Sequence, residues 1–287
     1  MECKIRDLDV HCDVRGEGVP VVMIHGMGVD HRVMTACMEP VFDARTEAWK
    51  RIYFDLPGMG KTPGADWIGC SGDMVELILD LVDQLIPGER FLLVGESYGG
   101  YLAQGIIHLR PECLAGMLLI GPLVEPDDDK RDVPYSVSFR TPALEDALDE
   151  DDDWMFDLFV TDQTEANWAR FRDEMLTGFA AGDPEFKSKI RENPDAYSLG
   201  YDVHNLVEPF MGPSLIITGR QDGLVGYRDP WSILESYPRC TFAVLDMAGH
   251  AMQIDRDRLF GALVNDWLDR LYGFWTVSIC TADKNAP

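Results

Sequence analysis

The chain has 287 residues, of which 46% are hydrophobic and 26% are charged, a balance typical of a folded globular protein. Its 50 acidic and 25 basic residues give a formal net charge of -25, which disfavours nucleic acid and anionic membranes as partners. The N-terminus has no apolar run of signal-peptide length, and no later segment approaches the roughly 20 apolar residues of a spanning helix. We therefore expect a cytoplasmic protein with no membrane partner.

The predicted strands begin with residues 4–14, which alternate loosely and end in a glycine-containing turn at 15–18, a pattern of two short antiparallel edge strands. Apolar runs suited to buried parallel strands follow at 19–24, 51–54, 91–94, 117–120, 214–217 and 241–245. Apolar stripes at helical spacing lie at 73–86 and 256–272. This alternation predicts an α/β fold with a doubly wound, mostly parallel sheet.

The alternation breaks between about 123 and 211, where no strong strand pattern is found. An acidic stretch at 145–153, interpreted as a solvated face or a helix start, leads into aromatic-rich helical segments. We interpret the region as a helical cap inserted after the sixth strand. The core would then comprise residues 1–123 and 212–287, and the cap residues 124–211.

Aromatic residues are frequent in the predicted cap, more so than its own small core requires. We expect some of them to face a substrate, although packing is the better expectation for any single one. They include Trp154, Phe156, Phe159, Trp168, Phe171, Phe179, Phe186, Tyr197 and Tyr201.

The cysteines predict neither a disulfide framework nor a zinc site, because they are scattered, odd in number and never in a C-x-x-C pair. We expect reduced and mostly buried thiols. The seven are Cys3, Cys12, Cys37, Cys70, Cys113, Cys240 and Cys280.

The sharpest motif is G-E-S-Y-G at 95–99, which follows a predicted strand and precedes a helical stretch. It matches G-x-S-x-G in the strand-turn-helix context that this motif requires. The turn is so tight that side chains two residues to either side of Ser97 would collide, which explains Gly95 and Gly99. It would hold the Ser97 hydroxyl above the sheet and aim the first helical amides at the same point. Ser97 is therefore the predicted nucleophile.

A serine hydroxyl is a poor nucleophile near neutral pH, so it needs a base and a group that orients the base. His250 lies between the last predicted strand and the last helix, where a loop can lean over the strand tips. Asp222 follows the preceding strand; its alternative interpretation is a simple Asp-Gly turn. The histidines at 11, 31, 108 and 204 lack such a position and are interpreted as surface or packing residues.

The motif H-G-M-G at 25–28 ends the strand at 19–24, where a loop that binds an oxyanion belongs. The expected donors are the backbone amides of Met27 and Tyr98. Gly26 would let the chain bend close to the serine, and His25 is interpreted as a structural hydrogen-bonding residue rather than a catalyst.

These motifs resemble the α/β-hydrolase superfamily, in particular capped serine hydrolases of the esterase type, over nearly the whole chain. The resemblance rests on the motifs at 25–28, 55–60, 95–99, 219–222 and 249–250, and on the chain order Ser97, Asp222, His250. It implies hydrolysis of a carboxylic ester or related acyl bond of a small molecule through an acyl-enzyme, with no metal and no organic cofactor.

Family members with this layout also include carbon-carbon bond hydrolases and proline iminopeptidases, which the chain likewise resembles and which remain alternatives. Ser97 disfavours haloalkane dehalogenases and epoxide hydrolases, whose nucleophile is an aspartate. Tyr98 weakens the peptidase interpretation, because proline iminopeptidases usually have tryptophan there. A non-catalytic small-molecule receptor is the last alternative and would be indicated by loss of a triad member, none of which is missing. Acyl group and oligomeric state remain open at this point.

Overall fold

The computed structural model describes residues 1–144, 148–204 and 206–276, so Cys280 and the start of the acidic stretch at 145–147 lie outside the described residues. Its centre is an eight-stranded sheet in the order β1-β2-β4-β3-β5-β6-β9-β10. β1 pairs with β2, and β2 with β4, in antiparallel fashion, and all other neighbours are parallel. The predicted α/β fold with a mostly parallel sheet is confirmed. The strands are β1 (Glu2–Ile5), β2 (Leu8–Arg15), β3 (Val19–Ile24), β4 (Trp49–Phe54), β5 (Phe91–Glu96), β6 (Leu114–Ile120), β9 (Ser214–Gly219) and β10 (Cys240–Leu245).

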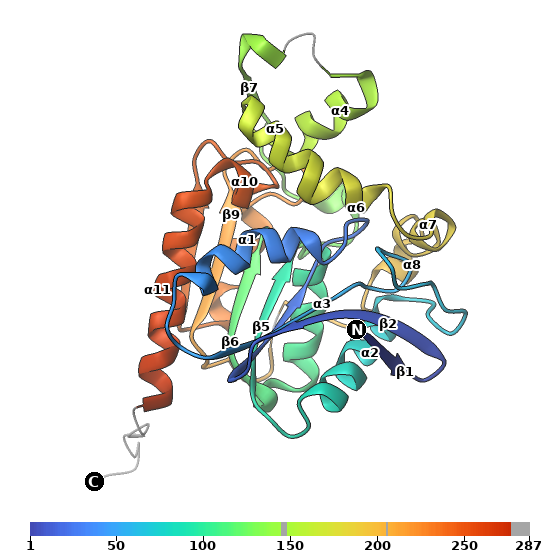
Figure 1. Cartoon of the computed structure of the whole chain (residues 1–287), viewed down its shortest axis with the longest axis vertical. Helices are drawn as coiled ribbons and strands as arrows, with labels where there is room; N and C mark the ends of the chain where they lie inside the picture. Colours follow the sequence, from blue (N-terminus) through green and yellow to red (C-terminus); the bar gives the residue numbers. More distant parts are fainter. Residues whose placement is uncertain (145–147, 205, 277–287) are drawn as a thin grey trace.

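Helices cover both faces of the sheet (Figure 1). α1 (Arg32–Asp43) packs with α11 (Asp257–Thr276) on one face, and α2 (Ser71–Leu85) with α3 (Tyr98–Leu109) on the other. In β5, Phe91 and Leu93 join the core under α2 and α3, whereas Leu92 and Val94 join the opposite core. Burial on both faces explains why the strands are continuous apolar runs.

The segment between β6 and β9 contains most of the remaining helices and includes the predicted cap (Figure 1). α4 begins with four acidic residues, whose charge favours a helix N-terminus, and its N-cap Asp149 accepts a hydrogen bond from the amide of Asp152. A two-residue parallel pair of strands, β7 and β8, is an addition that the sequence pattern did not predict. The elements are β7 (Phe139–Arg140), α4 (Glu150–Phe159), β8 (Asp162–Gln163), α5 (Glu165–Phe171), a π-helical turn (Arg172–Leu176), α6 (Thr177–Phe179), α7 (Pro184–Arg191) and α8 (Pro194–Tyr197).

Shorter helices complete the described chain. They are α9 (Arg228–Ser232), α10 (Met252–Asp255) and the 3-10 turns Pro111–Cys113, Asp128–Lys130, Pro142–Leu144 and Leu234–Ser236. Among the described helices, none combines the length and apolar character that crossing a bilayer requires.

The topology sets the position of the site. β5, β9 and β10 run parallel, so the segments that follow their carboxyl ends emerge at the same edge of the sheet. Ser97 follows β5, Asp222 follows β9 and His250 follows β10. The general rule for open α/β sheets is that ligands bind at this edge.

Candidate active site

Ser97 occupies the turn between β5 and α3 with φ 53° and ψ -116°, a strained conformation for a residue with a side chain. Its backbone is held on both sides, because its amide donates to the carbonyl of Ile120 (2.9 Å) and its carbonyl accepts from the amide of Leu123 (3.0 Å). The surrounding hydrogen bonds therefore maintain a conformation that presents the side chain to the pocket.

The two motif glycines are required by close backbone contacts. A Cβ atom at Gly95 would lie 2.5 Å from the carbonyl oxygen of Gly99. A Cβ at Gly99 would overlap the carbonyl oxygens of Ile24 and His25 at the end of β3. In the structure the contacts that exclude a side chain at these two positions are with neighbouring backbone atoms.

The structure brings together the three side chains that were predicted as a triad. His250 Nδ1 lies 2.8 Å from Asp222 Oδ2, and His250 Nε2 lies 2.8 Å from Ser97 Oγ. Since a carboxylate only accepts, Nδ1–H donates to Asp222 and Nε2 accepts from the serine hydroxyl. Asp222 is held in turn, because its Oδ1 accepts from the amides of Leu224 (2.9 Å) and Val225 (3.1 Å). The arrangement permits transfer of a proton from Ser97 to His250.

The environment of His250 favours its protonated form. Burial alone would lower its pKa, but the charge and hydrogen bond of Asp222 and the charge of Glu96 together raise the pKa of His250 above the ordinary value for histidine. The imidazole is thus a stronger base than a free histidine side chain.

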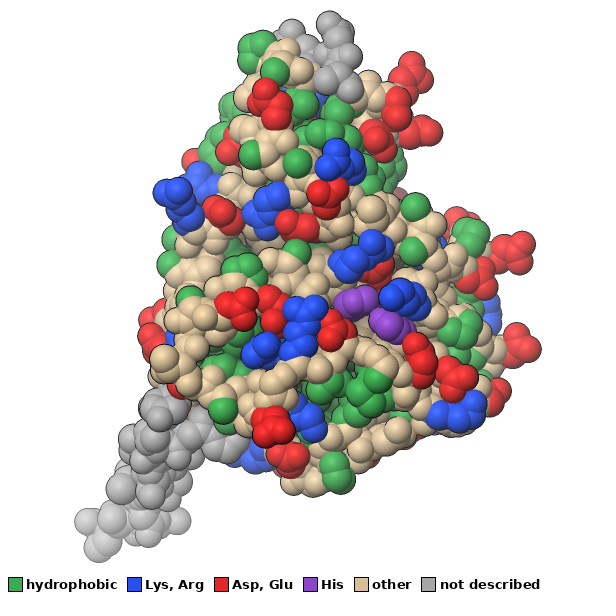
Figure 2. Space-filling model, viewed as in Figure 1, with side chains coloured by type: hydrophobic (Ala, Val, Ile, Leu, Met, Phe, Trp, Pro, Cys, Tyr) green, Lys and Arg blue, Asp and Glu red, His purple; other side chains and the backbone are tan. Residues whose placement is uncertain are grey.

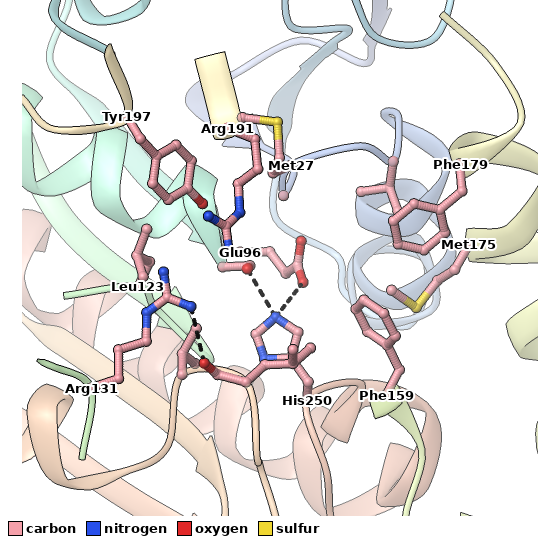
Figure 3. A pocket seen from close by; sticks show the side chains of 15 residues that line it. Met27, Glu96, Leu123, Arg131, Phe159, Met175, Phe179, Arg191, Tyr197 and His250 are labelled. Carbon is pink, nitrogen blue, oxygen red and sulfur yellow. Dashed lines mark hydrogen bonds and ion pairs between the residues drawn. The ribbon is translucent and has the colours of Figure 1, made fainter. Parts of the chain in front are cut away.

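Glu96, which the sequence analysis did not single out, is a buried carboxylic acid next to the nucleophile. Its Oε1 lies 3.9 Å from His250 Nε2 (Figure 3), and its Oε2 has no hydrogen-bond partner among the described residues. Burial raises the pKa of Glu96. A signal was available in the sequence, since a charged residue directly at the end of a buried strand needs an explanation.

The loop after β3, which was predicted to bind the oxyanion, lies against the turn that holds Ser97. Met27 lines the pocket beside Ser97. Tyr98 is the first residue of α3, so its amide is one of the four N–H groups that a helix leaves without an internal partner. A Cβ at Gly26 would overlap Glu96 Oε2 and approach Ser97 Cβ to 3.1 Å. Glycine at 26 therefore permits this close approach.

His25 is fully buried and lies between two loops. Its Nδ1–H donates to the carbonyl of Gly26 (2.8 Å), and its Nε2 accepts from the amide of Leu56 (2.9 Å). Burial lowers the pKa of His25, so the ring is neutral when it accepts this bond. Both ring nitrogens are used in holding the loops after β3 and β4 together.

The carboxylate of Asp255 connects the His250 loop to the segment after α4. It accepts hydrogen bonds from the amides of Gly249 (2.7 Å), Asp162 (2.8 Å) and Thr161 (3.1 Å). The position of His250 therefore depends on a contact with the inserted segment.

A pocket above Ser97 has two different sides (Figure 3). It contains about 560 Å³ of space that is open in part to solvent. Phe159, Met175 and Phe179 form one side, and Arg131, Arg191 and Tyr197 lie on the other. The aromatic side chains among them, Phe159, Phe179 and Tyr197, belong to the group that was expected to include substrate-facing residues.

Other aromatic residues of the inserted segment pack instead of lining the pocket. Phe156 and Phe171 are fully buried, with ring centroids 5.4 Å apart, and Trp168 lies 5.2 Å from Phe156. Trp154 is 63% exposed. The inserted segment therefore contains both packing and pocket-facing aromatic residues, and the sequence alone does not separate the two groups.

One group in the described part of the chain has metal-ligand types: His11, His31 and Asp55, whose ligand atoms lie within 4.8 Å of one another. Both Asp55 oxygens already accept hydrogen bonds, Oδ1 from the amide and Nδ1 of His31 and Oδ2 from the amide of Lys61. These bonds tie the start of α1 to the loop after β4. None of the three residues lines the pocket at Ser97.

Known proteins resemble this chain over most of its length. It is 22% identical over 269 residues to a pimeloyl-(acyl-carrier protein) methyl ester esterase of Legionella pneumophila (strain Paris), covering 91% of this chain and 100% of the relative. It is 24% identical over 277 residues to a 2-hydroxy-6-oxononadienedioate/2-hydroxy-6-oxononatrienedioate hydrolase of Paraburkholderia phymatum, covering 91% of each.

The fold recurs in solved structures. An alpha/beta superfamily hydrolase from Oenococcus oeni PSU-1 superposes with a TM-score of 0.85 at 24% identity, covering 95% of this chain and 99% of the other. A meta-cleavage product hydrolase, CumD, superposes with a TM-score of 0.70 at 23% identity, covering 94% and 98%.

Residues 21–262, most of the chain, match the profile of the family described as Alpha/beta hydrolase family. With the fold and the order of the motifs, this match identifies the chain as a member of the alpha/beta hydrolase family.

Proposed function

We propose that the protein is a serine hydrolase that cleaves a carboxylic ester or related acyl bond of a small molecule through an acyl-enzyme. The observation that carries the proposal is the continuous hydrogen-bonded chain from Ser97 through His250 to Asp222, with 2.8 Å at each step. This is the arrangement that acyl transfer by a serine requires.

In the proposed reaction, Ser97 Oγ attacks the carbonyl carbon while His250 Nε2 takes the hydroxyl proton. The amides of Met27 and Tyr98 bind the oxygen that becomes negatively charged. The bond to the leaving group then breaks, and His250 gives its proton to the leaving oxygen. Water repeats the cycle on the acyl-enzyme, which releases the acid and restores the Ser97 hydroxyl.

Carbon-carbon bond hydrolysis is the second candidate. It is supported by relatives whose names describe 2-hydroxy-6-oxononadienedioate hydrolases, at a similar identity to those named methyl ester esterases. The aminopeptidase alternative is disfavoured, because Arg131 and Arg191 in the pocket would repel a substrate's ammonium group.

Short p-nitrophenyl esters test the proposal directly. We expect the wild-type protein to release p-nitrophenol, and Ser97→Ala to lose about 10⁴-fold or more of kcat while its unfolding transition is unchanged. Ser188→Ala is the matched control, because Ser188 is exposed on α7 and does not line the pocket, and it should retain full activity.

A fluorophosphonate reagent tests the nucleophile independently of substrate choice. Mass spectrometry should find a single adduct on the peptide that contains Ser97. A wild-type protein that cleaves no activated ester and gives no adduct at Ser97 would overturn the proposal and favour a receptor. An adduct at Ser97 without ester turnover, combined with cleavage of a vinylogous diketone, would favour the carbon-carbon hydrolase.

A further inference from the structure

Two arginine side chains reach the pocket from different parts of the chain. Arg131 follows the 3-10 turn after β6, and Arg191 is the last residue of α7. Both line the pocket that contains Ser97 and His250, on the side opposite Phe159 and Phe179 (Figure 3). Cations in this place are notable in a chain that carries a net charge of -25.

Three backbone carbonyl groups hold the Arg131 guanidinium, in addition to the carboxylate described below. Its side chain is 8% exposed, and it donates to the backbone carbonyls of Glu125 (2.8 Å), Leu224 (3.2 Å) and Pro126 (3.2 Å). Carbonyl groups orient a guanidinium without cancelling its charge. The Arg191 guanidinium lies over the ring of Tyr197, 4.7 Å from its centroid. This cation–π contact restricts the position of the Arg191 side chain.

One carboxylate bridges the two arginines. Asp128 Oδ1 lies 2.6 Å from an Nη of Arg131, and Asp128 Oδ2 lies 2.6 Å from Arg191 Nη2. Each carboxylate oxygen therefore binds one guanidinium group. Asp128 itself is 54% exposed and belongs to a three-residue 3-10 turn at the outer side of Arg191. Asp128 does not line the pocket at Ser97 but a neighbouring hollow that Arg191 also lines, together with Asp127, Asp129 and Glu192. The charged residues that line the pocket itself, apart from the triad, are the two arginines and the buried Glu96.

We propose that this pair of arginines binds a carboxylate at the end of the substrate remote from the scissile bond, in competition with Asp128, which pairs with both guanidinium groups from outside the pocket. The inference rests on the proposed hydrolase function and names its substrate class: acyl compounds with an apolar linker and a terminal carboxylate. The linker would lie along Phe159, Met175 and Phe179. Two guanidinium groups, one for each oxygen, provide the geometry that a carboxylate prefers.

The first test compares mono-p-nitrophenyl glutarate with p-nitrophenyl valerate, which have acyl chains of equal length and differ at the terminal carboxylate. We expect kcat/KM of the wild type to be about tenfold or more higher for the glutarate ester. Arg191→Gln should lower kcat/KM for the glutarate ester about tenfold more than that for the valerate ester, which removes the preference, and Arg191→Lys should restore part of the preference. Arg172→Gln, at an exposed position outside the pocket, is the matched control and should change neither rate.

The second test removes the carboxylate of Asp128, which competes with the substrate for the two arginines. Asp128→Asn should lower the ratio of KM for the glutarate ester to KM for the valerate ester about threefold or more, because the competing carboxylate is removed. Asp129→Asn removes the same charge from the same turn but makes no ion pair with either arginine among the described residues, and should leave KM for both esters unchanged. Equal effects of the two substitutions would overturn the role of Asp128.

The outcomes separate this inference from the proposed function. If the wild type hydrolyses the valerate ester without preferring the glutarate ester, the carboxylate site is overturned and the hydrolase function stands. The same conclusion follows if Arg191→Gln and Arg191→Lys lower kcat/KM for both esters equally. If neither ester is cleaved, the proposed function fails, and titration of glutarate into the protein by calorimetry then decides the site alone. Heat of binding that disappears in Arg191→Gln supports the site, and absence of binding overturns it.

Discussion

The imidazole of His250 has a carboxylate on each side, Asp222 at Nδ1 and Glu96 at 3.9 Å from Nε2. Only the neutral imidazole can accept the Ser97 proton, so activity must fall as the pH drops through the pKa of His250. Because that pKa is raised, we expect the acid limb of kcat/KM to have its midpoint above the ordinary histidine value of about 6.5. A pH-rate profile with a neutral ester measures it, and a midpoint well below 6 would contradict the assignment.

Substitution of Glu96 provides the control for this pH dependence. Glu96→Gln keeps the size of the side chain but removes the charge that helps to raise the pKa of His250. The acid limb should then move to lower pH. Glu112→Gln, at an exposed position, should leave the profile in place. A merely structural role of Glu96 would change kcat at all pH values without moving the midpoint.

At the scale of elements, the position of His250 depends on Asp255, which binds the amides of Gly249, Thr161 and Asp162. Asp255→Ala leaves these three amides, two of them buried, without their acceptor, so we expect the free energy of unfolding to fall by about 2–4 kcal/mol. Because the His250 loop loses an anchor, kcat should also fall. Urea denaturation and ester kinetics measure the two effects.

Asp246→Ala is the comparison for this substitution, because Asp246 lies in the same loop but is exposed and accepts one hydrogen bond, from Gln221. Its effect on the free energy of unfolding should stay below about 1 kcal/mol. Equal losses for the two substitutions would show that the loop is not anchored through Asp255.

The elements were largely predictable because the physical signals were local. Strands buried on both faces read as apolar runs, and α2 and α11 read as stripes at helical spacing. The helix α1 was not predicted, although Val33, Cys37 and Val41 on its buried face have that spacing. Its sequence also contains Pro40, which cannot donate a helix hydrogen bond and argues against a helix at this point, and polar residues interrupt the stripe. Strand lengths were less accurate, since β6 begins three residues before the predicted run at 117–120.

The candidate site was predictable where one local motif fixes the geometry. The strand, turn and helix around Ser97 form a single continuous segment, and the residues after β9 and β10 reach the same sheet edge through the topology. Arg131 and Arg191 had no such signal, because their convergence depends on how the inserted segment packs over the sheet. The extent of a separate cap domain at 124–211 remains a prediction for the same reason.

At the scale of the whole molecule, the dominant property is the charge of -25. Acidic side chains are spread over the face shown in Figure 2, with basic side chains between them. Many of these basic groups form exposed ion pairs, such as Lys4 with Asp9 and Arg110 with Asp83, each of which stabilises the protein little. Because 50 acidic residues face only 25 basic ones, the net negative charge repels itself in the compact state.

Salt should therefore stabilise this protein. At about 0.1 M ionic strength the screening length is about 10 Å, so the many long-range repulsions weaken more than the short ion pairs do. We expect the free energy of unfolding to rise by about 1 kcal/mol, and Tm by about 2–4 °C, between roughly 10 and 300 mM NaCl. Thermal denaturation followed by circular dichroism measures the shift, and KCl should give the same curve because screening does not depend on the identity of the cation. A Tm that falls with either salt would mean that the attractive pairs outweigh the net repulsion, whereas a rise with NaCl alone would point to a bound sodium ion.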